Sequence, residues 1–185
     1  MAFGRAKKNA DPLDESALHE YAVKALGRRM LTVSELTRRL RSKVESEPSG
    51  QAKIDAVLGR LKAYGYLNDA DYAATYARLR QENASMGKRR VRQDLAVKGV
   101  QAELIKETLE AAYQDVNEEA LARRHLERKG VKQPGNEKEA ARVMRMLVRA
   151  GFSTGVIFRI LKSWKIEDET LAVLETIDEP HQGEE

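Results

Sequence analysis

One apolar pattern occurs twice in this sequence with the same internal spacing. Val91 and Leu95 lie four residues apart, which places both side chains on one face of a predicted helix, and Gly99 favours the positive φ that ends a helix. The first occurrence comprises Val91, Leu95, Gly99, Val100, Ile105, Leu109 and Ala112, and the second comprises Val143, Leu147, Gly151, Phe152, Ile157, Leu161 and Trp164. A pattern that recurs at fixed offsets predicts tandem structural repeats.

A looser copy of the pattern precedes these two. Leu36 and Leu40 repeat the first spacing, and a second stripe begins at Ile54, behind a loop expected at residues 48–50. No segment alternates with a period of two, so strands are not expected. The sequence therefore predicts an all-α protein, an elongated array of three tandem three-helix repeats. The expected divisions are a disordered basic lead at 1–12, repeats at 13–67, 68–116 and 117–165, with the most basic helix in the central repeat, and a disordered acidic tail at 166–185.

Capping signals predict where several helices begin. Thr32 and Glu35 have the spacing of a capping box, and Leu31 with Leu36 has that of a hydrophobic staple. In the same way Ser153 is expected to cap the last major helix. The helix before this capping box is expected at residues 14–29, and the helix after the loop at 48–50 is expected at residues 51–64. The side chains expected to face inward in the later repeats include Tyr72, Ala73, Tyr76, Leu79, Leu121, His125 and Leu126.

Charge is distributed unevenly along the chain. The net charge is +4, but residues 166–185 contain eight acidic side chains and no Lys or Arg, so the preceding residues carry +12. A body this basic favours a polyanion or an acidic protein surface as partner. Two alternatives stay open: the Lys and Arg side chains only solvate the helices, or the acidic segment folds back and masks the basic body.

The helix that contains Val91 and Leu95 has a cationic opposite face. Arg89 and Arg92 fall on that face, one turn apart, and Lys88 and Arg90 flank them. Arg38 and Arg41 point outward from the equivalent helix of the first repeat. The predicted binding face consists of Lys88, Arg89, Arg90, Arg92, Lys98, Arg38 and Arg41.

Several functional classes lack their usual residue patterns. The absence of Cys excludes disulfides and thiolate metal sites, and His19, His125 and His181 are too far apart in sequence to suggest a metal centre. No glycine-rich phosphate loop and no clustered catalytic set occurs, so we expect no enzyme activity, cofactor or metal. No apolar run of membrane-spanning length and no signal peptide is present, so we expect a cytoplasmic protein without membrane contact.

Three blocks of sequence resemble the RecX family of regulatory proteins, which bind the RecA recombinase. They are the run Ser34–Leu40, the junction Tyr64–Asp69 followed by Tyr72 and Ala73, and the block Gly87–Leu95 with Lys98, Gly99 and Val100. The resemblance covers residues 16–164 and is most specific in the middle block. It implies an all-helical, elongated protein of three-helix repeats that modulates RecA by lying along the nucleoprotein filament.

The resemblance and the basic body lead to the following functional hypothesis. The chain is expected to be a monomeric, non-enzymatic protein that binds the RecA filament, binds single-stranded DNA weakly and non-specifically, and inhibits the recombinase, ATPase and coprotease activities of RecA in DNA repair and the SOS response. The alternative is a stand-alone, non-sequence-specific nucleic-acid-binding protein, and a third possibility is a purely structural repeat scaffold. Aromatic residues make up only 5% of the chain, so a base-stacking platform is not expected.

Overall fold

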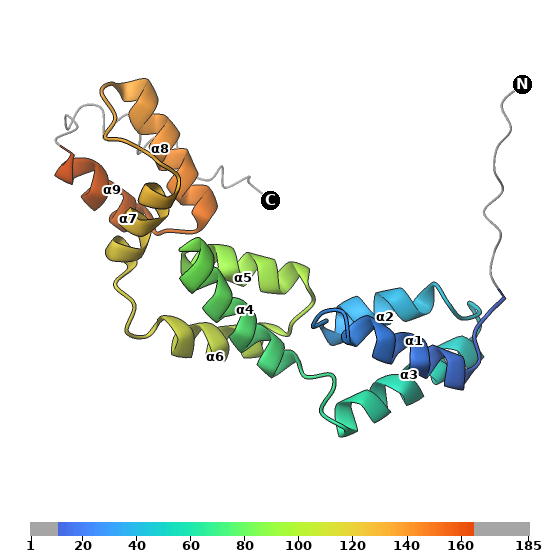
Figure 1. Ribbon diagram of the computed structural model, residues 1–185. Helices are drawn as coiled ribbons and strands as arrows, with labels where there is room; N and C mark the ends of the chain where they lie inside the picture. Colours follow the sequence, from blue (N-terminus) through green and yellow to red (C-terminus); the bar gives the residue numbers. More distant parts are fainter. Residues whose placement is uncertain (1–10, 165–185) are drawn as a thin grey trace, which may run out of the picture. The chain divides into compact units, whose positions relative to one another are not determined.

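The computed structural model describes residues 11–164, and in this range the chain is helical without strands (Figure 1). The all-α class predicted from the sequence is therefore confirmed. Residues 1–10 of the expected lead and the whole of the expected acidic tail lie outside the described residues. The helices are α1 (Glu15–Leu26), α2 (Val33–Arg41), α3 (Pro48–Ala63), α4 (Asp69–Ala84), α5 (Lys88–Val97), α6 (Ala102–Tyr113), α7 (Glu118–Arg128), α8 (Glu137–Ala150) and α9 (Thr154–Ser163).

The chain forms two compact units. Of the described residues, the first unit contains those up to Ala73 together with Ala96–Ala102, and the second contains Ala74–Leu95 and those from Glu103 to residue 164. In the first unit α1, α2 and α3 enclose a core of aliphatic side chains. Its fully buried members are Leu18, Leu36, Leu40, Ile54 and Leu61. Within each helix these side chains are spaced so that they form one apolar stripe that faces the core. Burial of such a stripe is the main source of stability for helices this short.

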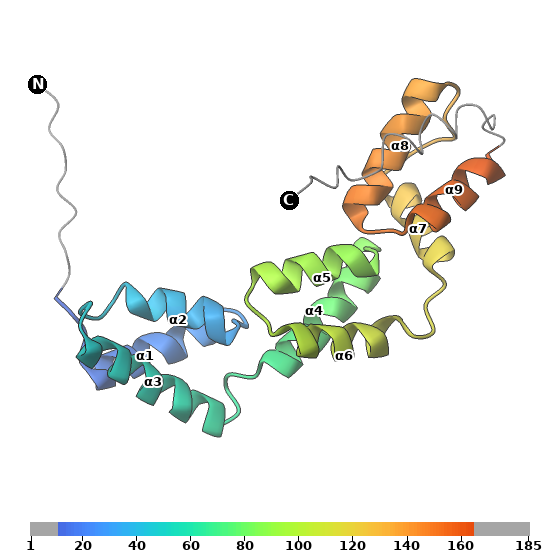
Figure 2. The ribbon, with the colours of Figure 1, turned by 180° about the vertical axis from the view of Figure 1, so that it is seen from behind.

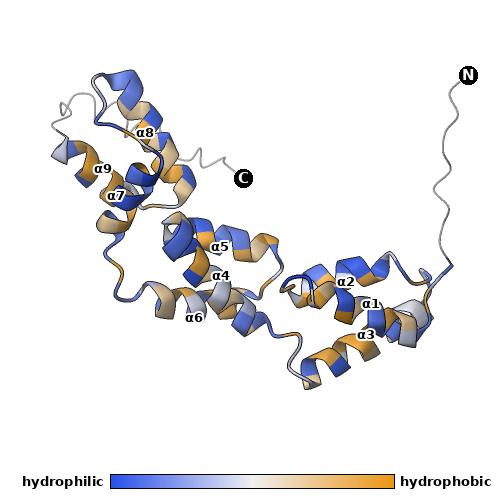
Figure 3. Cartoon of the chain, in the orientation of Figure 1, coloured by the Kyte–Doolittle hydropathy of each residue, from blue (hydrophilic) through white to orange (hydrophobic). Residues whose placement is uncertain are grey.

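The second unit has its own apolar core. Helices α7, α8 and α9 supply most of it, and α8 and α9 lie side by side in both views (Figure 1 and Figure 2). Bands of hydrophilic and apolar residues alternate along α5 and α8 (Figure 3), as expected for helices that bury only one face. Fully buried side chains in this unit include Leu95, Leu109, Leu126, Leu147, Phe152, Ile157 and Ile160.

Most of the predicted boundary signals are confirmed. The Thr32 hydroxyl accepts a hydrogen bond from the Glu35 amide at 3.0 Å, and the Glu35 carboxylate accepts one from the Thr32 amide at 3.3 Å. Gly99 and Gly151, which the repeat pattern places at helix ends, have φ values of +78° and +87°. Both glycines occupy the left-handed conformation that ends α-helices.

The expected loop at residues 48–50 is wrong, because these residues form the first turn of α3. Pro48 is tolerated at the first helical position, since the amide it lacks has no partner there. Gly50 suits this turn for a steric reason: a Cβ at this position would overlap the carbonyl oxygen of Glu45. Pro48 and Gly50 therefore lie in the first turn of α3 and do not form a loop before it.

The inward placement of Leu79 is also wrong. Its side chain is 42% exposed, whereas Ala77 is fully buried. Helix α4 passes from the first unit into the second after Ala73, so the stripe begun by Tyr72 and Ala73 is not continued against the same core. A periodicity argument assumes one core along the whole helix, and α4 does not meet that condition.

Ser153 occupies the N-cap position of α9 but makes no side-chain cap. Its hydroxyl and its amide instead donate to the two carboxylate oxygens of Glu118, each at 2.9 Å. A carboxylate is a stronger acceptor than a neutral group, so the hydroxyl donates to α7 rather than serving its own helix. Glu118 thus links α7 to α9. No helix within the described range has the length and apolarity needed to span a membrane.

Candidate functional site

The first turn of α5, which carries the predicted cationic residues, is held by the end of α8 within the second unit. The amide of Gly87 donates to the carbonyl of Ala150 at 2.8 Å, and the amide of Arg89 donates to the carbonyl of Gly151 at 3.2 Å. This approach requires glycine at position 87, because a Cβ there would overlap the Gly151 carbonyl. The backbone that carries the cations is therefore fixed by hydrogen bonds to a second helix.

The two faces of α5 are arranged as the spacing predicts. Val91 and Leu95 are fully buried, whereas Arg89 and Arg92 are exposed and Lys88 is half-buried. The aliphatic pair sets the rotation of the helix about its axis. The guanidinium groups consequently lie on the solvent side, where they add little to the stability of the fold.

Lys88, Arg89 and Arg92 line one pocket of about 390 Å³. The remaining lining residues are Tyr113, Val116, Glu118 and Ser153. The single carboxylate among them, that of Glu118, already accepts two hydrogen bonds from Ser153. Among residues 11–164, no carboxylate oxygen lies within 4.0 Å of these three cations. The pocket, here called the α5 cluster, therefore offers three cationic groups to an anion.

Tyr113 closes one wall of the α5 cluster as a neutral group. Its hydroxyl donates to the carbonyl of Met86 at 2.9 Å. Burial raises the pKa of Tyr113 to about 12, because the phenolate would lose its hydration. At neutral pH this residue adds no negative charge to the pocket.

Arg90 belongs to a different set of contacts. Its guanidinium lies 3.0 Å from the Asp94 carboxylate, one turn along α5. The hydroxyl of Tyr76 donates to the same carboxylate at 2.9 Å, and the guanidinium of Arg80 lies 4.8 Å from the Tyr76 ring centre. Burial is the main reason that the pKa of Tyr76 is raised. The charge of Arg90 is thus balanced locally, and Arg90 does not line the α5 cluster.

Lys98, Arg38 and Arg41 lie in the first unit. The Lys98 ammonium is 3.2 Å from the Glu35 carboxylate and 5.6 Å from the Tyr72 ring centre, and its side chain is only 22% exposed. A hydrogen bond with Tyr72 is the main cause that raises the pKa of Lys98, and partial burial opposes it. Arg38 and Arg41 are exposed on α2. The structure therefore brings together Lys88, Arg89 and Arg92, and it places the other predicted residues in separate surroundings.

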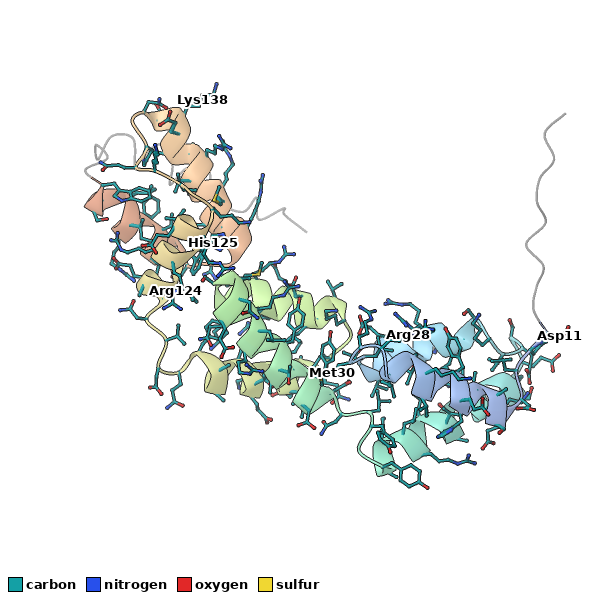
Figure 4. The ribbon with its side chains drawn as sticks, in the orientation of Figure 1. Asp11, Arg28, Met30, Arg124, His125 and Lys138 are labelled. Atoms are coloured by element: carbon teal, nitrogen blue, oxygen red, sulfur yellow. The ribbon has the colours of Figure 1, made fainter. Side chains whose placement is uncertain are left out.

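Four further cations lie on α8 and are not among the predicted site residues. Lys138, Arg142, Arg145 and Arg149 are all exposed, and Figure 4 shows Lys138 near the N-terminal end of this helix. Their helical spacing in the sequence, which predicts one cationic face, is a signal that could have identified them. The repeat pattern includes only the apolar residues of α8, which face the core.

The histidine expected to face inward does so. His125 is buried, its Nδ1 lies 3.0 Å from the carbonyl oxygen of Ala84, and its ring meets that of Phe152 edge-on. Figure 4 shows it within the helices of the second unit. No group of three or more His, Asp or Glu side chains that could hold a metal ion occurs in residues 11–164.

Comparisons with known proteins agree with one another. The family model described as "RecX, second three-helix domain" matches residues 68–109. The chain is 35% identical over 141 residues to the regulatory protein RecX of Leptothrix cholodnii, which covers 76% of this chain and 85% of that protein. It is 33% identical over 151 residues to the regulatory protein RecX of Thermus thermophilus, which covers 80% of this chain and 91% of that protein.

Two solved structures share the fold. A crystal structure of RecX from Lactobacillus salivarius matches with a TM-score of 0.63 and 20% identity, over 82% of this chain and 96% of that one. A crystal structure of a regulatory protein RecX matches with a TM-score of 0.64 and 23% identity, over 80% of this chain and 71% of that one. At these identities the likeness concerns the path of the backbone, and it agrees with the predicted tandem helical repeats.

Proposed function

The chain belongs to the RecX family of regulatory proteins, and from this premise we propose that it regulates the RecA recombinase by binding RecA filaments on single-stranded DNA. Such a filament presents DNA phosphates and acidic side chains, and either can occupy a cationic pocket. We propose the α5 cluster as the contact site. Binding there lowers the recombinase, ATPase and coprotease activities of RecA, and the protein acts as a cytoplasmic monomer without catalysis of its own.

The observation that carries this proposal is the contrast within α5. Arg90 is matched by Asp94 at 3.0 Å, whereas Lys88, Arg89 and Arg92 gather around a pocket whose one carboxylate is already hydrogen-bonded. An exposed ion pair within one helix adds only about 0.3–0.5 kcal/mol to stability, but it means that the charge of Arg90 already has a carboxylate partner. The three cations of the α5 cluster contribute little to the fold and so fit a partner's anionic groups.

The experiment is a titration of this protein into RecA that is hydrolysing ATP on single-stranded DNA, first at substoichiometric and then at stoichiometric ratios. We expect the steady-state rate of ATP hydrolysis to fall as the protein is added. The Arg89→Glu, Arg92→Glu double variant should relieve this inhibition while keeping the helical circular dichroism signal. A rate that does not change with the wild-type protein would exclude inhibition as the mode of action.

Binding measurements separate this proposal from the stand-alone nucleic-acid-binding alternative. If the double variant loses naked single-stranded DNA but retains full affinity for DNA-free RecA, the α5 cluster contacts phosphates rather than protein. If it loses DNA-free RecA, the contact is with the recombinase itself. Both contacts are expected to weaken with salt, but only phosphate contacts release the counterions condensed on DNA.

A further inference from the structure

The four exposed cations on α8 form one straight stripe. Lys138, Arg142, Arg145 and Arg149 follow the spacing i, i+4, i+7 and i+11, which places them within one face of the helix. At a rise of about 1.5 Å per residue the stripe is about 16 Å long. Val143 and Leu147 on the opposite face are buried, so the core fixes the direction of the stripe toward solvent.

The stripe cations have no carboxylate partners among the described residues, a property they share with Arg89 and Arg92 of the α5 cluster. Other guanidinium groups of the second unit are paired one turn along their own helix, as in Arg78–Glu82 at 2.9 Å and Arg123–Glu119 at 2.8 Å. Throughout residues 11–164, no carboxylate oxygen lies within 4.0 Å of a stripe cation. Like charges one turn apart destabilise a helix by about 0.2–0.5 kcal/mol per pair. The stripe is therefore a small cost to the free protein that a bound polyanion would remove.

A groove of about 320 Å³ lies beside the stripe and shares Arg142 with it. Its apolar lining comes from Val131, Pro134, Val143 and Met146, and its cationic lining comes from Lys129, Lys132 and Arg142. Glu139 is the one acidic lining residue, and its carboxylate accepts a hydrogen bond from the Gly135 amide at 2.8 Å. Apolar and cationic side chains in one groove suit a nucleotide, because the base can contact the apolar groups while the phosphate contacts the cations. Duplex DNA keeps its bases stacked inside, so the groove favours a single strand.

We propose that the α8 stripe and its groove bind the phosphate backbone of single-stranded nucleic acid. This contact extends the proposed function, since it gives the protein a direct contact with DNA that does not involve RecA and that uses residues outside the lining of the α5 cluster. An acidic protein surface could also match the charges of the stripe. The straight line of four cations over about 16 Å matches the regularly repeated charges of a phosphate backbone, which is why we assign the stripe to a nucleic acid.

The test compares two triple variants with equal changes in net charge. Arg142→Gln, Arg145→Gln, Arg149→Gln removes most of the stripe. The control Arg60→Gln, Arg78→Gln, Arg123→Gln removes three arginines that contact carboxylates. Affinity for an oligo(dT) strand is measured without RecA at several salt concentrations, after circular dichroism and thermal melting have shown that both variants are folded. Each phosphate contact on a single strand contributes about 0.7 to the slope of log K against log salt.

We expect the stripe variant to lose about 2 units of that slope and more than tenfold in affinity at low salt, while the control stays near wild type. Its loss on a duplex of the same length should be smaller. Equal slopes in the two variants, or a larger loss on the duplex, would overturn the inference. So would unchanged DNA binding together with lost affinity for DNA-free RecA, since the stripe would then contact protein.

The inference and the proposed function can fail separately. If the wild-type protein leaves RecA ATP hydrolysis unchanged while the stripe variant loses the salt slope, the proposed function is wrong and the stripe still binds nucleic acid. If the wild-type protein inhibits RecA through the α5 cluster while both triple variants bind oligo(dT) equally, the regulation stands and the stripe assignment fails.

Discussion

At the scale of single residues, Gly151 determines whether α5 and α8 can meet. Its φ is +87°, and a Cβ would overlap the backbone nitrogen of Arg90. Gly151→Ala therefore adds a steric overlap to the cost of a left-handed residue, and we expect a loss of about 2–4 kcal/mol in the free energy of unfolding. Urea denaturation monitored by circular dichroism measures it.

Gly130 provides a matched control for this prediction. Its φ is +64°, but no atom would meet a Cβ added there. Gly130→Ala should cost only about 1 kcal/mol, the price of the left-handed conformation alone. Equal losses at the two positions would mean that the close approach of α8 to α5 is not important for stability.

The raised pKa of Tyr113 predicts how the stability of the protein responds to alkaline pH. Its pKa in the folded protein is about 12, raised from 10.0 by burial. Below pH 10 the phenol is neutral in the folded and the unfolded state, and its contribution to the free energy of unfolding is fully present. As the pH rises toward 12, the phenol loses its proton in the unfolded state only, which favours unfolding, so this contribution is lost. The melting temperature of Tyr113→Phe should therefore fall less between pH 9 and 11 than that of the wild-type protein. Parallel curves for the two proteins would refute the assignment.

At the scale of helices, Thr32 serves two elements at once. Its hydroxyl accepts from the Glu35 amide, which caps α2, and donates to the carbonyl of Lys98 at 2.6 Å. Thr32→Ala removes both hydrogen bonds from a fully buried position, and we expect it to cost about 2–3 kcal/mol. Thr32→Ser keeps both bonds and loses about 0.8 kcal/mol for one buried methyl group. Chemical denaturation of both variants checks this order, and a larger loss for serine would contradict it.

A similar helix contact occurs once in each unit. In the first, the N-cap residue Thr32 binds the Lys98 carbonyl, and Gly99 lies against Ser34. In the second, the Gly87 amide donates to the Ala150 carbonyl, and Gly151 lies against the backbone nitrogen of Arg90. The beginning of one helix thus meets the glycine that ends another. The glycines at fixed offsets were visible in the sequence, and this contact explains sterically why glycine is needed there.

The sequence predicted those features of the fold that depend on local interactions. The capping box at Thr32, the helix end at Gly151 and the buried face at Val91 and Leu95 all follow from residues a few positions apart. Features that depend on distant partners were not predictable. Ser153 binds Glu118, which lies 35 residues away, and that carboxylate competes with the local capping role.

The same distinction applies to the candidate site. The pairing of Arg90 with Asp94 was accessible from the sequence, because the two residues lie one turn apart on α5. The pairing of Lys98 with Glu35 spans 63 residues and needed the folded first unit to become visible. The cationic face predicted from the sequence is therefore reduced, in the second unit, to Lys88, Arg89 and Arg92.

At the scale of the whole molecule, the cations of the basic body divide into those that have carboxylate partners and those that have none. Within the second unit the unpaired cations include the α5 cluster and the α8 stripe, whereas Arg78, Arg90 and Arg123 are matched by carboxylates. Net charge alone predicts that any two charge reversals weaken binding to a polyanion equally. A defined binding surface predicts that the position of the reversal matters.

One measurement distinguishes a defined binding surface from an effect of net charge most directly. It is the affinity of this protein for preformed RecA filaments on single-stranded DNA, measured by fluorescence anisotropy at physiological salt. We predict that Arg89→Glu with Arg92→Glu weakens binding at least about tenfold, or about 1.4 kcal/mol. Lys62→Glu with Lys106→Glu, an equal charge change at two exposed lysines outside the α5 cluster, should leave binding near wild type. Equal affinities for the two double variants would contradict a binding site at the α5 cluster.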